Sequence, residues 1–410
     1  MTKRIPVIIA GTDCLSGVTT WADQLRLALA DHPRYDVKSL FVGEDAPESC
    51  DLAVASVEDG LQLLRSLAPA IVMPNYIWPL YLAGLERGIR CLGMCHADDE
   101  DQYYRPLSWY EPVISKYIAV SRECDARLSQ CMPYRTGDIE TLPYGVRVPA
   151  PLRRDYQTKP LRLIYAGRVT QPQKRVWDFI PLVENLLRTR VPFVFDIIGD
   201  GDEFEPLRQM MKARVPAADV NFHGRIPHSQ MAAKWSAHDI FVQVSDFEGT
   251  SVSMLEAMAH GAVPVVTAAS SGIAGVINHG DNGYVVPVGD MAAMANVMAQ
   301  LAGDEALLPA ASQAAHRTAQ GYALDQYCEK FTRILDELVA AEPVADHHKR
   351  YGRYSPMHPL LLQQRMLTQH AEAEEPKKRE RALKGFFKGG LMSWRRSKSQ
   401  RADLGDCQAA

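Results

Sequence analysis

Short apolar runs alternate with segments of helical periodicity along this chain, and this alternation limits the folds that the sequence can adopt. Six runs in the first 150 residues have the length and composition of strands. Strand, helix and strand in succession build a parallel sheet that is covered on both faces. The strand runs are Ile5–Ala10, Val37–Val42, Leu52–Ala55, Ala70–Met73, Cys91–Cys95 and Tyr117–Val120, with helix candidates at Val18–Ala30, Gly60–Leu67 and Pro79–Arg87. The first half is therefore expected to be an α/β domain of the doubly wound type.

The same alternation restarts after a polar segment bounded by proline. We interpret residues 151–160 as a linker between residues 1–150 and a second doubly wound domain at residues 161–340. Because 410 residues are two or three domain lengths, two Rossmann-like domains facing a central cleft are the expected architecture. The strands expected in the second domain are Leu161–Ala166, Phe193–Ile198, Val220–Phe222, Ile240–Val244, Ala262–Val266 and Tyr284–Val286.

Composition excludes several other classes of protein. Hydrophobic residues make up 47% and charged residues 23%, which is ordinary for a globular chain. No run reaches 18 apolar residues, so a transmembrane helix is not expected. The 8 cysteines show no disulfide-like spacing; Cys91 and Cys95 lack the second pair of a zinc site, and we interpret them as core residues of a cytoplasmic protein.

The charge of the chain is unevenly distributed. Between Lys377 and Arg401 there are ten Lys or Arg and one acidic residue, Glu380, so the rest of the chain carries a net charge of −13. Residues 341–410 are interpreted as a polar C-terminal extension that ends in this basic tail, residues 377–401. Because the cations are interleaved with aromatic and aliphatic residues, an anionic membrane surface or a protein partner is expected to bind the tail. Nucleic acid is not expected, because the acidic body would repel it.

The most informative stretch is VSDFEGTSVSMLEAMAHGAVP, residues 244–264. Glu248 and Glu256 are eight residues apart, and Gly249 permits close approach of the backbone. A helix beginning near Thr250 would direct the backbone N–H groups of residues 250–252, Ser251 among them, at a ligand beside Glu248. Taken alone, the pattern is also typical of a strand, a turn and an amphipathic helix with two solvated glutamates.

Two cations follow the first strand of the second half. In LRLIYAGRVTQPQK, Arg168 and Lys174 come after the strand Leu161–Ala166, at the edge where a parallel sheet commonly binds phosphate. Arginine offers a fixed fork of donors and lysine a mobile point charge, and both suit a diphosphate. The nearby IIGDGDE and FHGRIP are not specific by themselves.

In this order and spacing, these motifs resemble the retaining glycosyltransferases of family 4, which have the GT-B fold. The resemblance is strong over residues 160–340, where HGDNGYVVPVGD completes the series. It implies that Arg168 and Lys174 hold the diphosphate of a nucleotide sugar. It also implies that Glu248 contacts the sugar hydroxyls and Glu256 the ribose hydroxyls. Arg168 and Lys174 are six residues apart where five is usual, which implies a reshaped loop around Pro172.

The first half resembles the family more loosely. Gly17 stands in a loop where the family has Gly-Gly, although Ser16 departs from that pattern, and His96 stands where the family has an active-site histidine. We therefore expect Gly17 to approach the donor, and His96 and Glu248 to be catalytic. A D-x-D pattern occurs at Asp98–Asp101, but neither a metal nor a cofactor is implied.

The expected function is transfer of a hexosyl group from a nucleoside diphosphate sugar to a glycan or lipid-linked acceptor, with retention of configuration. The expected location is the cytoplasm, peripheral to the inner face of the cell membrane. Two alternatives remain: a nucleotide-sugar epimerase of the same fold, and a non-catalytic glycosyltransferase-like subunit of a polysaccharide assembly. The sequence names neither the sugar, the base nor the acceptor.

Overall fold

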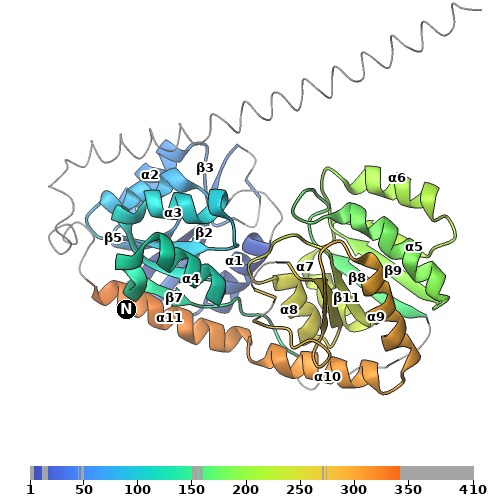
Figure 1. Cartoon of the computed structure of the whole chain (residues 1–410). Helices are drawn as coiled ribbons and strands as arrows, with labels where there is room; N and C mark the ends of the chain where they lie inside the picture. The colour runs from blue at the N-terminus through green and yellow to red at the C-terminus, as the bar shows by residue number, and fades with distance from the viewer. Residues whose placement is uncertain are drawn as a thin grey trace, which may run out of the picture. The chain divides into compact units, whose positions relative to one another are not determined.

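Two parallel sheets organise the chain. The computed structural model describes residues 4–11, 17–44, 46–47, 50–149, 156, 160–269, 272–273 and 275–341. Both sheets belong to one compact unit, residues 1–352, and helices cover both of them (Figure 1). The expected doubly wound α/β architecture is confirmed.

The first sheet has seven strands in the order β3-β2-β1-β4-β5-β6-β7. Its strands are all parallel, and Val7 of β1 lies beside Val37 of β2 on one side and Ile71 of β4 on the other. The strand order reverses between β1 and β4, which in such sheets opens a crevice at the carboxyl edge. The elements of this half are β1 (Ile5–Gly11), α1 (Gly17–Ala28), β2 (Tyr35–Val42), β3 (Leu52–Val54), α2 (Val57–Ser66), β4 (Ala70–Met73), η1 (Trp78–Leu85), β5 (Ile89–Cys95), η2 (Glu100–Tyr104), α3 (Arg105–Trp109), η3 (Glu111–Val113), β6 (Ile114–Ala119), α4 (Arg122–Cys131), η4 (Pro133–Asp138) and β7 (Ile139–Thr141).

The second sheet has six parallel strands in the order β10-β9-β8-β11-β12-β13. Here the order reverses between β8 and β11, so the loops that follow these two neighbouring strands meet at one edge. The elements that follow β7 along the chain are β8 (Leu161–Ala166), η5 (Val176–Asp178), α5 (Phe179–Thr189), β9 (Phe193–Ile198), α6 (Phe204–Arg214), β10 (Val220–Gly224), α7 (His228–Ala237), β11 (Ile240–Gln243), α8 (Val252–Ala259), β12 (Val263–Thr267), β13 (Tyr284–Val286), α9 (Met291–Gly303), α10 (Leu307–Gln320) and α11 (Leu324–Ala340).

Local signals in the sequence explain where several helices begin. The hydroxyl of Ser56 accepts from the backbone N–H of Asp59 and caps α2, and Ser121 caps α4 in the same way on Cys124. The expected helix at Pro79–Arg87 is instead a 3₁₀-helix, η1, with Pro79 in its first turn. Proline suits that position, because it lacks the N–H that the first turn leaves without a partner.

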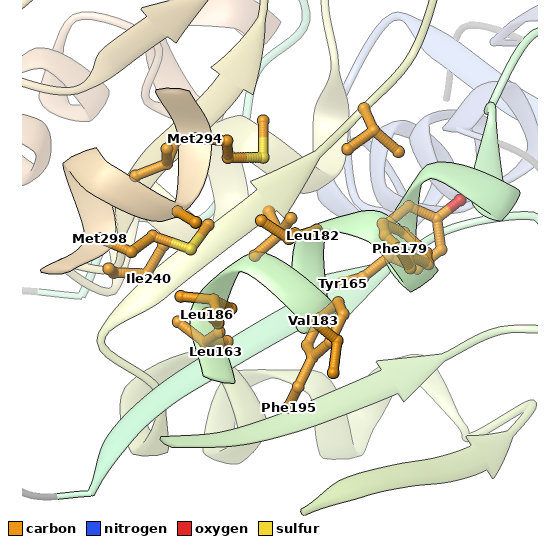
Figure 2. Close-up of a cluster of buried hydrophobic side chains, with 14 of the residues drawn as sticks. Leu163, Tyr165, Phe179, Leu182, Val183, Leu186, Phe195, Ile240, Met294 and Met298 are labelled. Atoms are coloured by element: carbon orange, nitrogen blue, oxygen red, sulfur yellow. The ribbon is translucent and has the colours of Figure 1, made fainter. Parts of the chain in front are cut away.

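The core of the second half lies between its sheet and the helices α5 and α9. Figure 2 shows the side chains of Leu182, Val183 and Leu186 from α5 packed with Met294 and Met298 from α9 and with residues of the strands. The ring of Phe179 meets that of Phe195 edge to face, with 5.3 Å between centroids. Replacing a buried phenylalanine of this kind by alanine costs ~3–5 kcal/mol of stability. This packing gives the loops at the sheet edge a rigid base.

Helix α11 belongs by its contacts to the first half. The indole N–H of Trp21 on α1 donates to the hydroxyl of Tyr327 on α11 at 2.9 Å, and the backbone of Val146 bonds with that of Leu324. The sequence-based division assigned residues through 340 to the second domain, whereas this last described helix packs against the first (Figure 1). A helical pattern shows an apolar face but not the sheet that the face covers.

Some regions singled out in the sequence cannot be compared with the structure. Of the linker 151–160, Tyr156 and Pro160 are among the described residues. The extension after Ala341, with the basic tail 377–401, lies outside them. Within the described part of the chain, no helix has the length and apolar character needed to cross a membrane.

Candidate active site

Glu248 and Lys174 form an ion pair at the carboxyl edge of the second sheet. Glu248 stands in the loop after β11 and Lys174 in the loop after β8, the strands between which the order reverses. The Lys174 Nζ atom donates to Oε1 of Glu248 at 2.6 Å. Glu248 is 7% exposed, so it is not the solvated glutamate that the motif alone would allow. A buried carboxylate of this kind is stabilised by its paired cation.

Arg168 lies in the same loop as Lys174 and is exposed. Its guanidinium donates to the side-chain oxygen of Gln173 at 2.8 Å, and the Gln173 amide donates to the carbonyl of Phe247 in the loop that carries Glu248. Gln173, which the sequence did not single out, therefore joins the two loops. Arg168 and Lys174 thus lie in one loop at this edge, and both are cations of a kind that suits an anion.

The Gly199-Asp200-Gly201 turn supports the loop that carries Arg168. Gly199 has a φ of +132°, and a Cβ added there would stand 1.8 Å from the carbonyl oxygen of Gly167. The backbone N–H of Val169 donates to the carbonyl of Asp200 at 2.9 Å. The two loops are thus packed backbone against backbone, which glycine alone allows at residue 199.

Glu256 lies on α8 and is held by two side chains that the sequence did not indicate. Its Oε1 accepts from Nε2 of Gln24 at 2.7 Å and lies 2.8 Å from Nε2 of His228. Gln24 is on α1 in the first half, and His228 begins α7, directly after the HGRIP motif. The hydrogen bond to Glu256 raises the pKa of His228 above its ordinary value. Glu256 is 9% exposed and, like Glu248, is buried.

The segment between the two glutamates touches the first half directly. A Cβ added at Gly249 would stand 2.1 Å from the carbonyl oxygen of His96, and the Thr250 hydroxyl donates to the carbonyl of Val120 at 2.5 Å. Helix α8 begins at Val252, close to the expected start, and the hydroxyl of Ser251 caps it by accepting from the N–H of Met254. Thr250 therefore anchors the loop to the first half instead of opening the helix.

Gly17 begins α1 and lies near the start of α8. A Cβ added at Gly17 would be 3.6 Å from a methyl group of Val252, an ordinary van der Waals distance. Of the expected site residues, the structure thus brings Gly17, His96, Gly249 and Thr250 to the contact between the two halves, while Ser251 caps α8.

His96 follows β5 and is buried, with both ring nitrogens engaged. Its Nδ1 is 2.6 Å from the hydroxyl of Tyr144, and its Nε2 is 3.0 Å from Oδ1 of Asn75, whose amide donates to the carbonyl of Ala10. Burial lowers the pKa of His96 to about 3. The imidazole is therefore neutral at neutral pH. The sequence did not indicate Asn75 or Tyr144, although Asn75 stands two residues after the strand Ala70–Met73.

The acidic run after His96 has local partners. Asp98 accepts from the hydroxyl of Tyr104 at 2.6 Å, Asp99 caps the turn that follows it, and Asp101 pairs with Arg105. In the described part of the chain, His, Cys, Asp and Glu side chains form no group of three that could hold a metal ion. These acids are accounted for by the local turn that they stabilise.

Comparison with known families and proteins connects this geometry to a family. Residues 160–304, which contain Arg168, Lys174, Glu248 and Glu256, match the family model described as Glycosyl transferases group 1. This part of the chain is a glycosyl transferases group 1 domain. The resemblance stated from the sequence motifs is confirmed as far as a glycosyltransferase domain over these residues, and retention of configuration stays a prediction.

Curated relatives cover part of the chain. A stretch of 240 residues, 57% of this chain and 24% of the relative, is 26% identical to the exopolysaccharide phosphotransferase of Streptomyces coelicolor. Another of 204 residues, 48% of this chain and 52% of the relative, is 28% identical to the phosphatidyl-myo-inositol mannosyltransferase of Mycobacterium leprae. The chain thus spans about a quarter and about half of the lengths of these two relatives.

Solved structures support the fold of the chain. HepE of Anabaena, solved with UDP-glucose, superposes with a TM-score of 0.67 at 14% identity and covers 82% of this chain and 100% of its own. With two parallel-sheet Rossmann-like domains and such neighbours, the fold is GT-B, as the sequence predicted.

Proposed function

We propose that this protein transfers a hexosyl group from a nucleoside diphosphate sugar to a hydroxyl acceptor with retention of anomeric configuration. The observation that carries the proposal is the ion pair of Lys174 with the buried Glu248, set at the strand-order reversal of a group 1 domain with Arg168 in the same loop. The crevice at such a reversal is where open α/β sheets bind nucleotides.

The chemistry required is stabilisation of charge on the leaving group. Breaking the glycosyl–phosphate bond places negative charge on the diphosphate, and the cations of Arg168 and Lys174 are suited to bind it. Loss of one such preorganised group typically costs ~10²–10³ in rate. Glu248 then has two roles: it holds Lys174 in place, and it accepts hydrogen bonds from sugar hydroxyls.

His96 is proposed to act by position. A neutral imidazole with both nitrogens engaged and a pKa of about 3 is a poor proton shuttle at neutral pH. Its carbonyl oxygen packs against Gly249, directly beside Glu248. This contact supports a role for His96 in positioning the loop that carries Glu248. The expected catalytic role of His96 is thus proposed to be positioning and not proton transfer.

The acceptor is proposed to be a glycan or a lipid-linked saccharide, used at the cytoplasmic face of the membrane. The basic tail 377–401, with its interleaved Phe386, Phe387 and Trp394, supports attraction to anionic lipid at about 1 kcal/mol per cation near the surface. The name of the mycobacterial relative, a phosphatidyl-myo-inositol mannosyltransferase, fits a lipid acceptor.

Product analysis tests the proposal against its alternatives. Glycosyl transfer releases a nucleoside diphosphate and needs an acceptor. Sugar-phosphate transfer, suggested by the name of the Streptomyces relative, would release a nucleoside monophosphate. An epimerase would convert the donor without an acceptor, and a non-catalytic subunit would bind nucleotide without turnover. A nucleoside diphosphate formed in step with a glycosylated acceptor supports the proposal, and each of the other three results contradicts it.

A further inference from the structure

Gln24 carries a buried side-chain oxygen that accepts no hydrogen bond from the residues that the structure describes. The side chain lies on α1 and is 5% exposed. Its Nε2 donates to Oε1 of Glu256 at 2.7 Å and is 3.3 Å from Nε2 of His228. Because an ionised carboxylate can only accept, the amide nitrogen must face Glu256, and this fixes which way the amide is turned.

The Oε1 atom of Gln24 is then left as a buried acceptor without a hydrogen-bond partner among the described residues. Such an atom is uncommon, since leaving a buried polar group unsatisfied costs about 1–3 kcal/mol. A hydroxyl or N–H of a ligand that reaches this oxygen would remove the cost. The Oε1 atom of Gln24 therefore indicates a ligand with a hydrogen-bond donor beside Glu256.

The proposed nucleotide offers that donor. Both inward donors, Gln24 and His228, converge on one oxygen of Glu256, namely Oε1. A ribose has two adjacent hydroxyls, and the second carboxylate oxygen together with Oε1 of Gln24 would supply one acceptor for each. Because Gln24 and His228 already donate to Oε1, both ribose hydroxyls would have to share the second oxygen of Glu256 if Gln24 offered no acceptor.

We infer that Gln24 is a nucleotide-binding residue contributed by the first half, whose Oε1 accepts a hydrogen bond from a ribose hydroxyl next to Glu256. This inference rests on the proposed function, because it requires a nucleoside diphosphate at Glu256. It follows that the first half takes part in nucleotide selection, and that the site prefers ribonucleotides over deoxyribonucleotides.

The test is a thermodynamic cycle that removes the Gln24 side chain and the ribose hydroxyl separately and together. UDP, GDP and ADP, each with its 2′-deoxy and 3′-deoxy counterparts, are titrated by calorimetry into the full chain and into Gln24→Leu. For the nucleotide that binds, Gln24→Leu should weaken the ribose form about tenfold. It should weaken the counterpart that lacks the contacted hydroxyl much less, because that contact is already absent.

A second variant separates direct contact from support of Glu256. Gln24→Lys keeps an N–H donor toward Glu256 but lacks an acceptor, so it should lose ribose discrimination as Gln24→Leu does. Gln209→Leu, the same chemical change on the exposed face of α6, is the matched control and should bind like wild type. Melting temperatures report whether each variant is folded, and Gln24→Lys serves alone if Gln24→Leu does not fold.

The outcomes distinguish this inference from the proposed function. The proposed role of Oε1 would be overturned if the folded Gln24 variants preferred the ribose nucleotide over its deoxy counterpart as strongly as wild type does. The same holds if Gln24→Lys alone kept this preference. Either result would leave the proposed function intact. Failure of wild type to bind any nucleoside diphosphate would overturn both. The inference is supported if both Gln24 variants lose the preference for the ribose nucleotide and Gln209→Leu keeps it.

Discussion

The ammonium group of Lys174 and the carboxylate of Glu248 lie 2.6 Å apart and join the loops that follow β8 and β11. The side chains are 16% and 9% exposed, so neither charge is solvated as a surface group would be. Removing one partner of a buried pair is costly because the other charge remains without compensation. Lys174 thus holds the two loops together, and the same ammonium group is suited to bind a diphosphate.

Substitution of the two proposed phosphate cations should weaken nucleotide binding selectively. Lys174→Ala and Arg168→Ala should each raise the Kd for the nucleoside diphosphate by about 10- to 100-fold, the range for a lost hydrogen bond to a charged group. Arg175→Ala is the control, because Arg175 already pairs with Asp178 and Asp246. Calorimetric titration measures all three, and equal affinity across the series would refute the phosphate assignment.

Gly249 should not tolerate a methyl group. The Cβ of Gly249→Ala would stand 2.1 Å from the His96 carbonyl oxygen, so the loop must move away from the first half. We expect a loss of ~1–3 kcal/mol in the free energy of unfolding, as for an overpacked core, together with a marked fall in turnover. Gly137→Ala, where an added Cβ meets nothing within 4 Å, should leave both unchanged. Wild-type stability and turnover in Gly249→Ala would contradict the contact.

The sequence predicted the strands and the helical segments closely, because each depends on local periodicity and turn residues. Apolar runs such as Leu161–Ala166 coincide with strands, and the Gly-rich turn at Gly199 fell where the backbone needs glycine. The motif around Glu248 and Glu256 was readable because its residues are close together in the chain.

What escaped prediction lies between residues that are distant in sequence. Gln24 and Glu256 are separated by 232 residues, and Trp21 and Tyr327 by 306. Neither periodicity nor capping reports which faces of distant elements meet, since both are properties of neighbouring residues. The partners of His96 were missed for the same reason.

Acid should destabilise the protein through His96. Burial lowers the pKa of His96 in the folded state to about 3, against an ordinary value of 6.5. Between these two values the unfolded chain binds a proton at His96 and the folded chain does not. Stability is therefore retained above pH 6.5 and falls as the pH decreases from 6.5 toward 3, by up to ~1.4 kcal/mol per pH unit from this residue.

Urea unfolding at pH 7, 6 and 5 measures the effect. His96→Gln should be less stable than wild type at pH 7, but its stability should fall less steeply with decreasing pH. Equal slopes for the two proteins would show that His96 does not carry this dependence.

The basic tail should carry any binding to lipid. Flotation with anionic liposomes at low salt should recover the full chain but not a chain that ends at Pro376, and neutral liposomes should recover neither. The residues removed lie outside those that the structure describes, so this prediction depends on their sequence. Equal recovery of the two proteins, or no recovery of the full chain on anionic lipid, would refute it.

The most direct measurement for the proposed glycosyl transfer compares wild type with Glu248→Ala. Nucleotide sugars are first screened for thermal stabilisation, since a bound ligand raises stability by RT ln(1 + [L]/Kd). Turnover of the stabilising donor is then followed by release of nucleoside diphosphate and by the anomeric configuration of the product. Wild type should release the diphosphate and retain the configuration, while folded Glu248→Ala should turn over at least ~10²-fold more slowly. Undiminished turnover in Glu248→Ala, an inverted product, or tight donor binding without any turnover by wild type would contradict the account.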